Sequence, residues 1–312
     1  MSDYLDRLDP AFREMIEFEG PTLFDALKQD VAAARGASAN FMALMASARP
    51  PFQGRKDEYR IAGLEDDPQV PVVEFFAEDV LHDDCIIIWL HGGGYLIGSA
   101  DDTVAKDLSK LAPVVSVEYR MAPEHRSPAA ARDVCAVIEH IAASRKPRKI
   151  VLAGASAGAG LAASAALMNR DRAGPEVAFQ LLIYPMLDDQ HDTVSGHMDI
   201  PPTAWTREVS LYAWSLYAEE NEASQYAAAT RATDHSRLPP AYIMCGDLDL
   251  FRDEDIEYAS KLRTCGVPVE FAIFPGAPMD LIFLRRKLKL ANAQLPLSDW
   301  HWNMHLLEQS IL

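Results

Sequence analysis

The sequence predicts an α/β fold in which helices cover both faces of a mainly parallel β-sheet. Strand-like and helix-like patterns alternate along much of the chain, and the later strands are apolar runs, as expected for strands buried on both faces. The chain has 312 residues, of which 49% are hydrophobic, and one large core can accommodate a chain of this size. We therefore expect a single structural unit.

The first part of the chain is expected to be helical. From about Pro10 to Ala48, apolar residues recur at spacings of three and four, and Pro50 and Pro51 end this pattern. Strand-like runs follow at Asp57–Ile61, Val70–Phe76, Cys85–Leu90, Pro113–Tyr119, Lys149–Leu152, Val177–Tyr184, Ala241–Cys245 and Val267–Phe274. Helices are expected between the later strands, at Pro128–Ala143, Ala157–Asn169 and Arg252–Cys265. We expect the earliest strands to form an antiparallel edge of the sheet.

One long stretch, from Leu187 to about Leu238, interrupts the alternation. It holds no convincing strand pattern but contains aromatic residues such as Trp205 and Trp214. We predict a helical insertion over the carboxyl ends of the strands, where ligands bind in open α/β folds; an ordinary surface excursion is the alternative. The predicted organisation is therefore N-terminal helices in residues 1–50 that contribute to a cap, a core of residues 51–187 and 239–312, and a cap insertion of residues 188–238.

Charge and composition exclude several classes of protein. The net charge of −17 disfavours a nucleic-acid partner, because binding to phosphates needs clustered cations. The N-terminus lacks the positive start and apolar run of a signal peptide, and no apolar stretch approaches the length of a membrane span. We expect a soluble cytoplasmic protein without a membrane partner. The four cysteines, Cys85, Cys135, Cys245 and Cys265, form no CxxC pair, so we expect buried thiols and no metal site.

The strongest local signal for chemistry is the segment Gly154–Gly158, which reads Gly-Ala-Ser-Ala-Gly. It follows the apolar run Ile150–Leu152 and precedes an alanine-rich helix. Small residues here allow a sharp turn from strand to helix that lifts the hydroxyl of Ser156 above the sheet, as in a nucleophile elbow. The start of the helix also directs N–H groups toward a developing anion. Ser156 is the predicted nucleophile; a turn with an idle serine is the alternative.

A second motif, His91–Gly94, follows the strand-like run that ends at Leu90. Acyl transfer passes through a tetrahedral oxyanion that needs fixed N–H donors, and glycine lets the backbone approach the substrate closely. The predicted donors of this oxyanion hole are the N–H groups of Gly93, Gly94 and Ala157. A flexible turn is the alternative for the glycines, and His91 is expected to brace the loop.

These motifs, with two further segments, carry a family resemblance. The four segments are His91–Gly98 (His-Gly-Gly-Gly-Tyr-Leu-Ile-Gly), Glu118–Glu124 (Glu-Tyr-Arg-Met-Ala-Pro-Glu), Gly154–Gly158 and Asp249–Glu254 (Asp-Leu-Phe-Arg-Asp-Glu). From about Val70 to Pro278 the chain resembles the hormone-sensitive-lipase-like esterases, a branch of the α/β-hydrolases. The resemblance implies an α/β-hydrolase fold with a helical cap. It also implies hydrolysis of short to medium acyl esters without a cofactor.

The resemblance implies that Asp249 is the carboxylate that orients a catalytic histidine. Its position agrees, because it follows the strand-like run Ala241–Cys245 and because this fold orders its triad as Ser, acid, His. Asp247 is the alternative, since either aspartate could also turn the chain before the helix that begins near Arg252.

The position at which the resemblance places the catalytic histidine holds Met279, after the segment Phe274–Pro278. A methionine can neither take a proton from Ser156 nor return one to a leaving alcohol. Loss of the triad histidine lowers kcat by about 10⁶ in subtilisin, which leaves about 10³ to 10⁴ over water. The sequence itself does not distinguish a natural loss of the base from an engineered one.

Two histidines follow Asp249, namely His301 and His305. They flank the apolar stripe of an expected terminal helix, so we interpret them as surface residues; a substitute base, or a metal site with Glu308, are the alternatives. Two earlier histidines, His191 and His197, lie at the start of the predicted insertion and could reach the cleft.

Three functions follow from these observations. The first is a serine carboxylesterase scaffold whose activity is lost or strongly reduced by Met279. The second is a non-catalytic protein that binds a small molecule in the same pocket. The third and weaker one is a slow reaction in which water activates Ser156. The expected partner is a small-molecule ester, no cofactor is expected, and a homodimer is left open.

Overall fold

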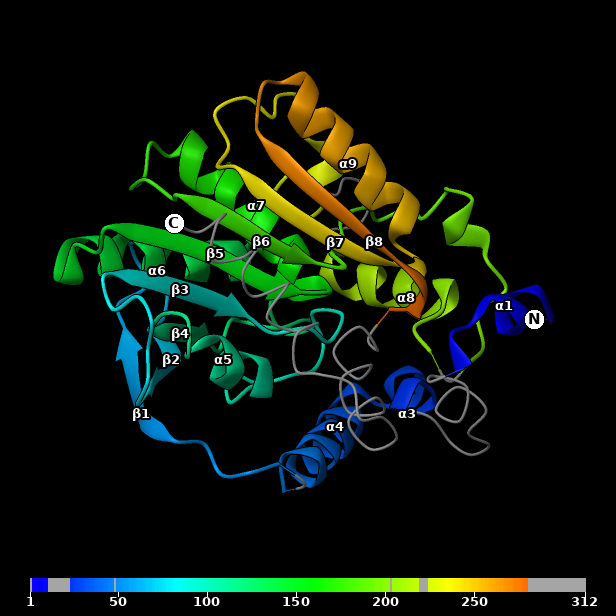
Figure 1. Cartoon of the computed structure of the whole chain (residues 1–312), viewed down its shortest axis with the longest axis horizontal. Coiled ribbons are helices and arrows are strands. Elements are labelled where there is room, and N and C mark those ends of the chain that lie inside the picture. Colours follow the sequence, from blue (N-terminus) through cyan, green and yellow to red (C-terminus); the bar gives the residue numbers. More distant parts are fainter. Residues whose placement is uncertain (1, 11–22, 48, 203, 219–223, 280–312) are drawn as a thin grey trace.

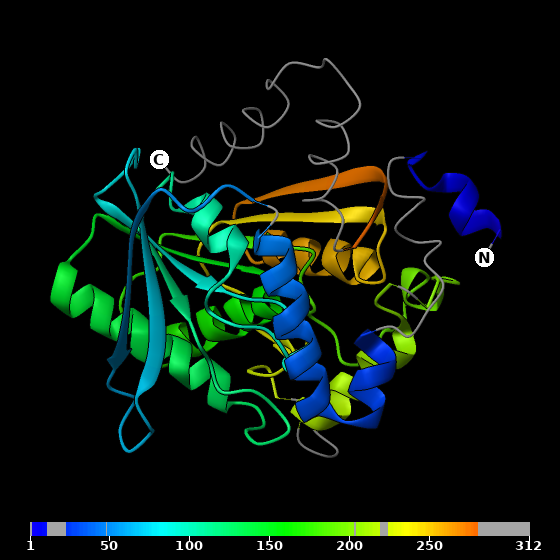
Figure 2. The ribbon, with the colours of Figure 1, turned by 90° about the horizontal axis from the view of Figure 1, so that it is seen from below.

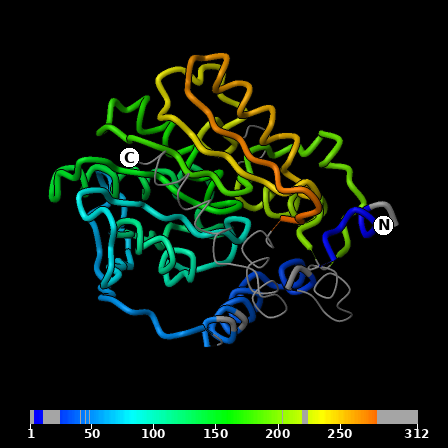
Figure 3. The backbone as a smooth tube through the Cα atoms, viewed as in Figure 1, coloured from blue at the N-terminus to red at the C-terminus, as the bar shows by residue number. Residues whose placement is uncertain are grey.

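The computed structural model describes residues 2–10, 23–47, 49–202, 204–218 and 224–279. Within these residues, eight strands form one sheet in the order β1-β2-β4-β3-β5-β6-β7-β8 (Figure 1). The strands are β1 (Gly54–Ile61), β2 (Val70–Ala77), β3 (Cys85–Leu90), β4 (Val114–Val117), β5 (Lys149–Ala155), β6 (Phe179–Ile183), β7 (Ala241–Leu248) and β8 (Val269–Pro278). The chain can be followed from strand to strand in the tube view (Figure 3).

Helices cover the sheet and extend beyond its carboxyl edge. The described helices are α1 (Ser2–Arg7), α3 (Leu23–Gln29), α4 (Val31–Ser47), α5 (Thr103–Leu108), α6 (Ala129–Arg145), α7 (Ala157–Asp171), α8 (Arg207–Tyr217) and α9 (Arg252–Thr264), with 3₁₀ turns at Ser195–His197 and Ala229–Arg231. Helices α6, α7 and α9 cover the same face of the sheet (Figure 2). Helices α3, α4 and α8 lie at the end toward which the parallel strands point (Figure 1).

The predicted α/β architecture is confirmed, including its antiparallel edge. Strand β2 runs antiparallel to β1 and β4, whereas neighbouring strands from β4 to β8 are parallel. Strand β1 lies at one edge of the sheet and carries mostly exposed charged residues, while every residue of β3 is buried. A buried strand needs apolar side chains on both faces, and an edge strand does not.

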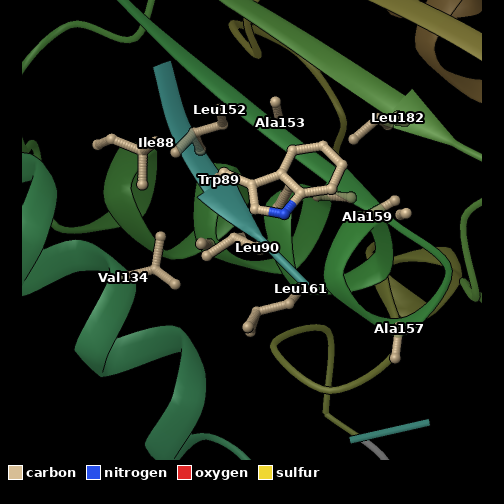
Figure 4. Close-up of a cluster of buried hydrophobic side chains, with 14 of the residues drawn as sticks. Ile88, Trp89, Leu90, Val134, Leu152, Ala153, Ala157, Ala159, Leu161 and Leu182 are labelled. Atoms are coloured by element: carbon tan, nitrogen blue, oxygen red, sulfur yellow. The ribbon is translucent and has the colours of Figure 1, made fainter. Parts of the chain in front are cut away.

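Side chains from several elements meet around β3, at the centre of the core. Ile88 and Trp89 are fully buried, and Figure 4 shows them among side chains of β5, β6, α6 and α7. Both chemical motifs leave the sheet from β3 and β5, so they start from a fully buried part of the core.

Several expectations for the elements differ from the structure. Helix α1 lies before Pro10, where the helical region was predicted to start, and helix α5 was not predicted at all. Each of these helices spans only six residues, which is too few to show a periodic pattern. Residues 11–22 of the predicted N-terminal helices lie outside the described residues. Cys265 is half-buried, whereas Cys85, Cys135 and Cys245 are buried, because Cys265 caps the end of α9.

The predicted insertion is less helical than expected. Its described residues contain no strand, as expected, but α8 is their one α-helix. Side chains instead stabilise turns: Thr193 accepts the N–H of Gly196 at 3.1 Å, and Asp188 accepts the N–H of Gln190 at 3.2 Å. Such bonds compete with helix formation. The division into core and cap stays a prediction. No helix in the described part of the chain is long and apolar enough to cross a bilayer.

Replacing Ile88 with alanine is expected to lower the free energy of unfolding by about 2 to 5 kcal/mol, because it opens a cavity in the tightly packed centre. The matched control is Ile256→Ala on α9, where the side chain is 41% exposed, and here the loss should stay near 0.5 kcal/mol. Urea unfolding followed by circular dichroism measures both. Equal losses would contradict the placement of β3 at the centre of the core.

Candidate active site

Ser156 occupies the turn between β5 and α7. Its backbone has φ 55° and ψ −122°, a region that a residue with a Cβ rarely adopts and that costs about 1 to 3 kcal/mol. The turn is tight as well: a Cβ on Gly158 would lie 2.1 Å from Leu90 O, and one on Gly154 would lie 2.4 Å from the carbonyl carbon of Gly158. The glycines at both ends of the motif are therefore needed for the elbow to form.

Hydrogen bonds hold the backbone of Ser156 on both sides. Its N–H donates to Ile183 O at 2.9 Å, and its carbonyl oxygen accepts from the N–H groups of Gly160 and Met186, each at 3.0 Å. The segment that follows β6 therefore lies directly behind the elbow. Since both polar groups of its peptide are engaged, Ser156 is kept in its strained conformation by the surrounding structure.

The glycine-rich loop after β3 lies beside the elbow. A Cβ on Gly92 would be 3.4 Å from the Cβ of Ser156. Gly93 and Gly94 follow with φ values of 116° and 60°, which favour glycine, and Ala157 is the first residue of α7. The structure thus brings the three residues predicted to form an oxyanion hole into the neighbourhood of Ser156.

His91 is part of the support for this loop. The ring is 2% exposed, it stacks on Tyr119 with centroids 4.3 Å apart, and its Nδ1 lies 2.8 Å from Gly92 O, to which it donates. The hydroxyl of Tyr119 donates to His91 O at 2.8 Å. A Cβ on Gly98 would lie 2.2 Å from the ring. These contacts fit the brace that the sequence predicted.

The two aspartates after β7 have different surroundings. Asp249 is fully buried, and its Oδ1 accepts the N–H of Phe251 at 2.9 Å. Asp247 is partly exposed and forms ion pairs with Arg7 at 3.0 Å and with Arg252 at 3.4 Å. The carboxylate of Asp247 is therefore engaged with two arginines at the surface, away from the buried position of Asp249.

Met279 lies next to Asp249 at the carboxyl edge of the sheet. Leu248 of β7 pairs with Pro278 of β8, so Asp249 and Met279 are the first residues to leave these neighbouring strands. The Met279 side chain is 5% exposed and belongs to the main apolar cluster. At the position where the family resemblance implies a histidine, the structure thus has a buried thioether.

Residues of the predicted insertion pack directly on the glycine-rich loop. A Cβ on Gly94 would lie 2.3 Å from a ring carbon of Trp205 and 3.4 Å from the Cβ of Ala213. The ring of Tyr95 stacks on Tyr217 of α8, with centroids 3.7 Å apart. The sequence pointed to the aromatic residues of this stretch but not to their contact with the loop, because that contact joins segments about a hundred residues apart.

The other histidines that the sequence analysis named differ in their surroundings. His191 is fully buried and bonded to side chains of α8 and α9. His197 is exposed and lies 3.0 Å from Asp192. His301, His305 and Glu308 lie outside the described residues. Within the described ranges, no group of three or more His, Cys, Asp or Glu side chains could hold a metal ion.

Comparisons with known proteins agree with this geometry. A family model for the alpha/beta hydrolase fold matches residues 87–282. Esterase LipI of Mycobacterium tuberculosis is 35% identical over 199 residues, which cover 59% of this chain and 62% of that relative. Carboxylesterase NlhH of the same organism is 33% identical over 234 residues, which cover 70% of this chain and 73% of that relative.

Solved structures that are titled esterases superpose on nearly the whole chain. The structure titled Bacterial Heroin Esterase superposes with a TM-score of 0.86 at 31% identity and covers 99% of both chains. An esterase from Pyrobaculum calidifontis superposes with a TM-score of 0.79 at 29% identity and covers 91% of this chain and 96% of its own. The chain therefore belongs to the alpha/beta hydrolase fold family, in its hormone-sensitive-lipase-like branch, among relatives that are named esterases.

Proposed function

We propose that the chain is a carboxylesterase scaffold that uses Ser156 as its nucleophile and lacks the base of the triad. The observation that carries this proposal is the strained elbow of Ser156, held between the glycine-rich loop after β3 and the start of α7. Strain of this kind persists only where the surrounding structure enforces it, and it clusters at active sites. A turn with no chemical role would have little need of it.

The proposed reaction is acyl transfer through Ser156. The hydroxyl attacks the ester carbonyl, and the N–H groups of Gly93, Gly94 and Ala157 hold the oxyanion that forms. The positive end of the α7 dipole stabilises the same charge. The alcohol leaves, and water then releases the acyl group from the serine.

Proton transfer is the step that Met279 impairs. In a complete site a histidine takes the proton of the serine hydroxyl and gives it to the leaving alcohol. With Met279 at this position, water serves as the proton acceptor in the unchanged chain, and turnover is slow. The oxyanion donors still provide about 10³ to 10⁴ over the uncatalysed rate.

Asp249 is the proposed carboxylate of the site. Its burial supports this role, because a fully buried carboxylate beside the next strand end can orient a ring and stabilise its positive charge. Asp247 is less suitable, because Arg7 and Arg252 already neutralise it.

The proposed substrates are esters of small molecules with short to medium acyl groups. The family to which the chain belongs supports this class, and one solved relative is named for the ester heroin. Trp205 and α8 pack on the oxyanion loop, and we propose that residues 188–238, with the N-terminal helices, form a cap that shapes the pocket.

A binding protein without turnover is the second candidate. The buried thioether of Met279 favours it, because an apolar side chain at this position extends the pocket wall without supplying a base. The retained elbow and glycine-rich loop favour the esterase scaffold. Rates of hydrolysis separate the two functions.

Met279→His is expected to raise kcat for p-nitrophenyl butyrate by about 10³-fold or more, because it restores the base. Adding Ser156→Ala to that variant should return the rate to the parent level. Release of p-nitrophenol measures both. Fast hydrolysis by the unchanged chain that depends on Ser156 would show instead that another base, such as His301 or His305, reaches the serine.

The two aspartates can be compared in the Met279→His background. Asp249→Asn should lower kcat by about 10⁴-fold, as the equivalent change does in a serine protease, because the restored histidine loses its orienting carboxylate. Asp247→Asn weakens only the surface pairs with Arg7 and Arg252, so its kcat should stay within about three-fold of the parent. The reverse order of effects would assign the carboxylate role to Asp247.

Gly94→Ala tests the oxyanion loop in the same background. The added Cβ would meet the ring of Trp205 at 2.3 Å and disfavour φ 60°, so the loop must shift and kcat should fall by about 10²- to 10³-fold. Gly36→Ala in α4 is the control, because nothing lies within 4 Å of its added Cβ. If Gly94→Ala retained full kcat, the loop would have no part in catalysis.

A further inference from the structure

A buried hydrogen-bond network joins α8, α9 and the segment after β6. Nε2 of His191 lies 2.7 Å from the hydroxyl of Ser210 and accepts the indole N–H of Trp214 at 3.1 Å. Nδ1 of His191 lies 2.9 Å from Oε2 of Glu254. His191 and Ser210 are fully buried, and Glu254 is 1% exposed.

The partners of His191 determine which ring nitrogen carries its proton. An indole N–H only donates, so Nε2 must accept, and the neutral ring holds its proton on Nδ1 and donates it to Glu254. Burial lowers the pKa of His191 to about 4, which keeps the ring neutral at pH 7. Burial and the nearby carboxylates of Asp188 and Asp189 raise the pKa of the Glu254 carboxyl well above its usual range, although the N–H groups of Leu187 and Asp188 oppose that rise. Both oxygens of Glu254 lie within hydrogen-bond distance of N–H donors, so the carboxyl group acts as an acceptor in this network.

Through its other oxygen, Glu254 holds the segment behind the nucleophile. Oε1 accepts the N–H of Leu187 at 3.1 Å and that of Asp188 at 3.4 Å. The preceding residue, Met186, donates its N–H to the carbonyl oxygen of Ser156 at 3.0 Å. Glu254 is thus connected to the elbow through three consecutive residues, Met186 to Asp188, whose N–H groups are all hydrogen-bonded.

Through His191, the same network holds α8 against the oxyanion loop. Ser210 and Trp214 of α8 bond to the ring of His191, and Arg207 donates to His191 O at 3.1 Å. The Trp214 ring lies 5.4 Å from that of Tyr95, the residue after Gly94. One side of the network therefore supports the nucleophile, and the other side supports the loop that is proposed to bind the oxyanion.

Ser210, His191 and Glu254 have the connectivity of a serine triad, but they cannot act as one. A catalytic serine must meet its substrate, whereas these three side chains are enclosed by α8, α9 and the segment after β6. Reversal of the ring tautomer would also place two N–H donors, on Nε2 and on Trp214, against each other. A fixed arrangement is suited to positioning, not to proton transfer.

We propose that His191 and Glu254 are a pair of positioning residues. Together they fix the position of the Ser156 elbow relative to the glycine-rich loop after β3. Glu254 acts through Leu187, Asp188 and Met186, and His191 acts through α8. The effect of the pair on catalysis rests on the proposed esterase function. The tautomer of His191 and the hydrogen bonds of Glu254 are independent of that function.

The first experiment measures the network without turnover. Nitrogen-15 NMR of the histidine rings in the full chain, with His191→Gln for assignment, should show a neutral His191 at pH 7 with its proton on Nδ1. Amide exchange of Leu187 and Asp188 should accelerate by about ten-fold or more in Glu254→Gln, because the amide replaces one of the two acceptor oxygens with an NH₂ donor that faces N–H groups. The amide of Ile243 in β7 reports any global loss of stability.

The second experiment measures catalysis in the Met279→His background. Glu254→Gln should lower kcat for p-nitrophenyl butyrate by about ten-fold or more with little change in KM, because positioning acts on the transition state. The matched control is Glu74→Gln in β2, which makes the same change at a glutamate that is also 1% exposed, paired with Arg145 far from the elbow. If Glu254→Gln does not fold, Ser210→Ala removes a single hydroxyl from the network and should show the same split between kcat and KM.

The outcomes separate this proposal from the proposed function. A proton on Nε2, a charged ring at pH 7, or a kcat loss no larger than that of Glu74→Gln would overturn the positioning role. An inactive Met279→His variant whose His191 tautomer and amide exchange are as expected would overturn the esterase proposal and leave the network established.

Discussion

The close contact between the elbow at Ser156 and the neighbouring strand is the constraint on which the proposed site depends. Gly158 touches the carbonyl oxygens of Leu90 and His91, where a Cβ would lie 2.1 and 2.4 Å away. Two strand ends are thereby brought together, so that the turn after β5 and the loop after β3 lie side by side. Because the backbone is so close, Gly158 must remain glycine, and Ser156 has a positive φ in the turn just before it.

Local signals predicted the parts of the fold that depend on local rules. The run Cys85–Leu90 forms a strand with the predicted bounds, because six consecutive buried apolar residues fit a central parallel strand. The Gly-Ala-Ser-Ala-Gly segment forms a strand-to-helix turn, since its small residues allow the backbone to turn sharply against neighbouring backbone. Both features result from the properties of neighbouring residues.

Features that depend on contacts between distant segments could not be predicted in this way. Nothing near His191 in the sequence indicates that Ser210, Trp214 and Glu254 would surround it, because these residues meet only after α8 and α9 pack. The limited helix content of residues 188–238 was likewise missed, since local side-chain bonds from Asp188 and Thr193 replace helical ones. The family resemblance located Glu254 within a motif but implied no role for it.

The proposed site leaves one chemical question, because Met279 stands where the family resemblance implies its base. Met279 lies at the strand end beside Asp249, within a core that is otherwise arranged as in proteins named esterases. We propose that Ser156 is a nucleophile that needs only a proton acceptor. Its structural setting predicts that a single substitution restores the reaction.

The most direct test is covalent labelling by a p-nitrophenyl alkylphosphonate, whose adduct resembles the tetrahedral intermediate. Mass spectrometry should find one phosphonyl group per chain in the Met279→His variant, on the peptide that contains Ser156, and none after the further change Ser156→Ala. Absence of labelling in the Met279→His variant, or labelling at another residue, would contradict the assignment of Ser156 as the nucleophile.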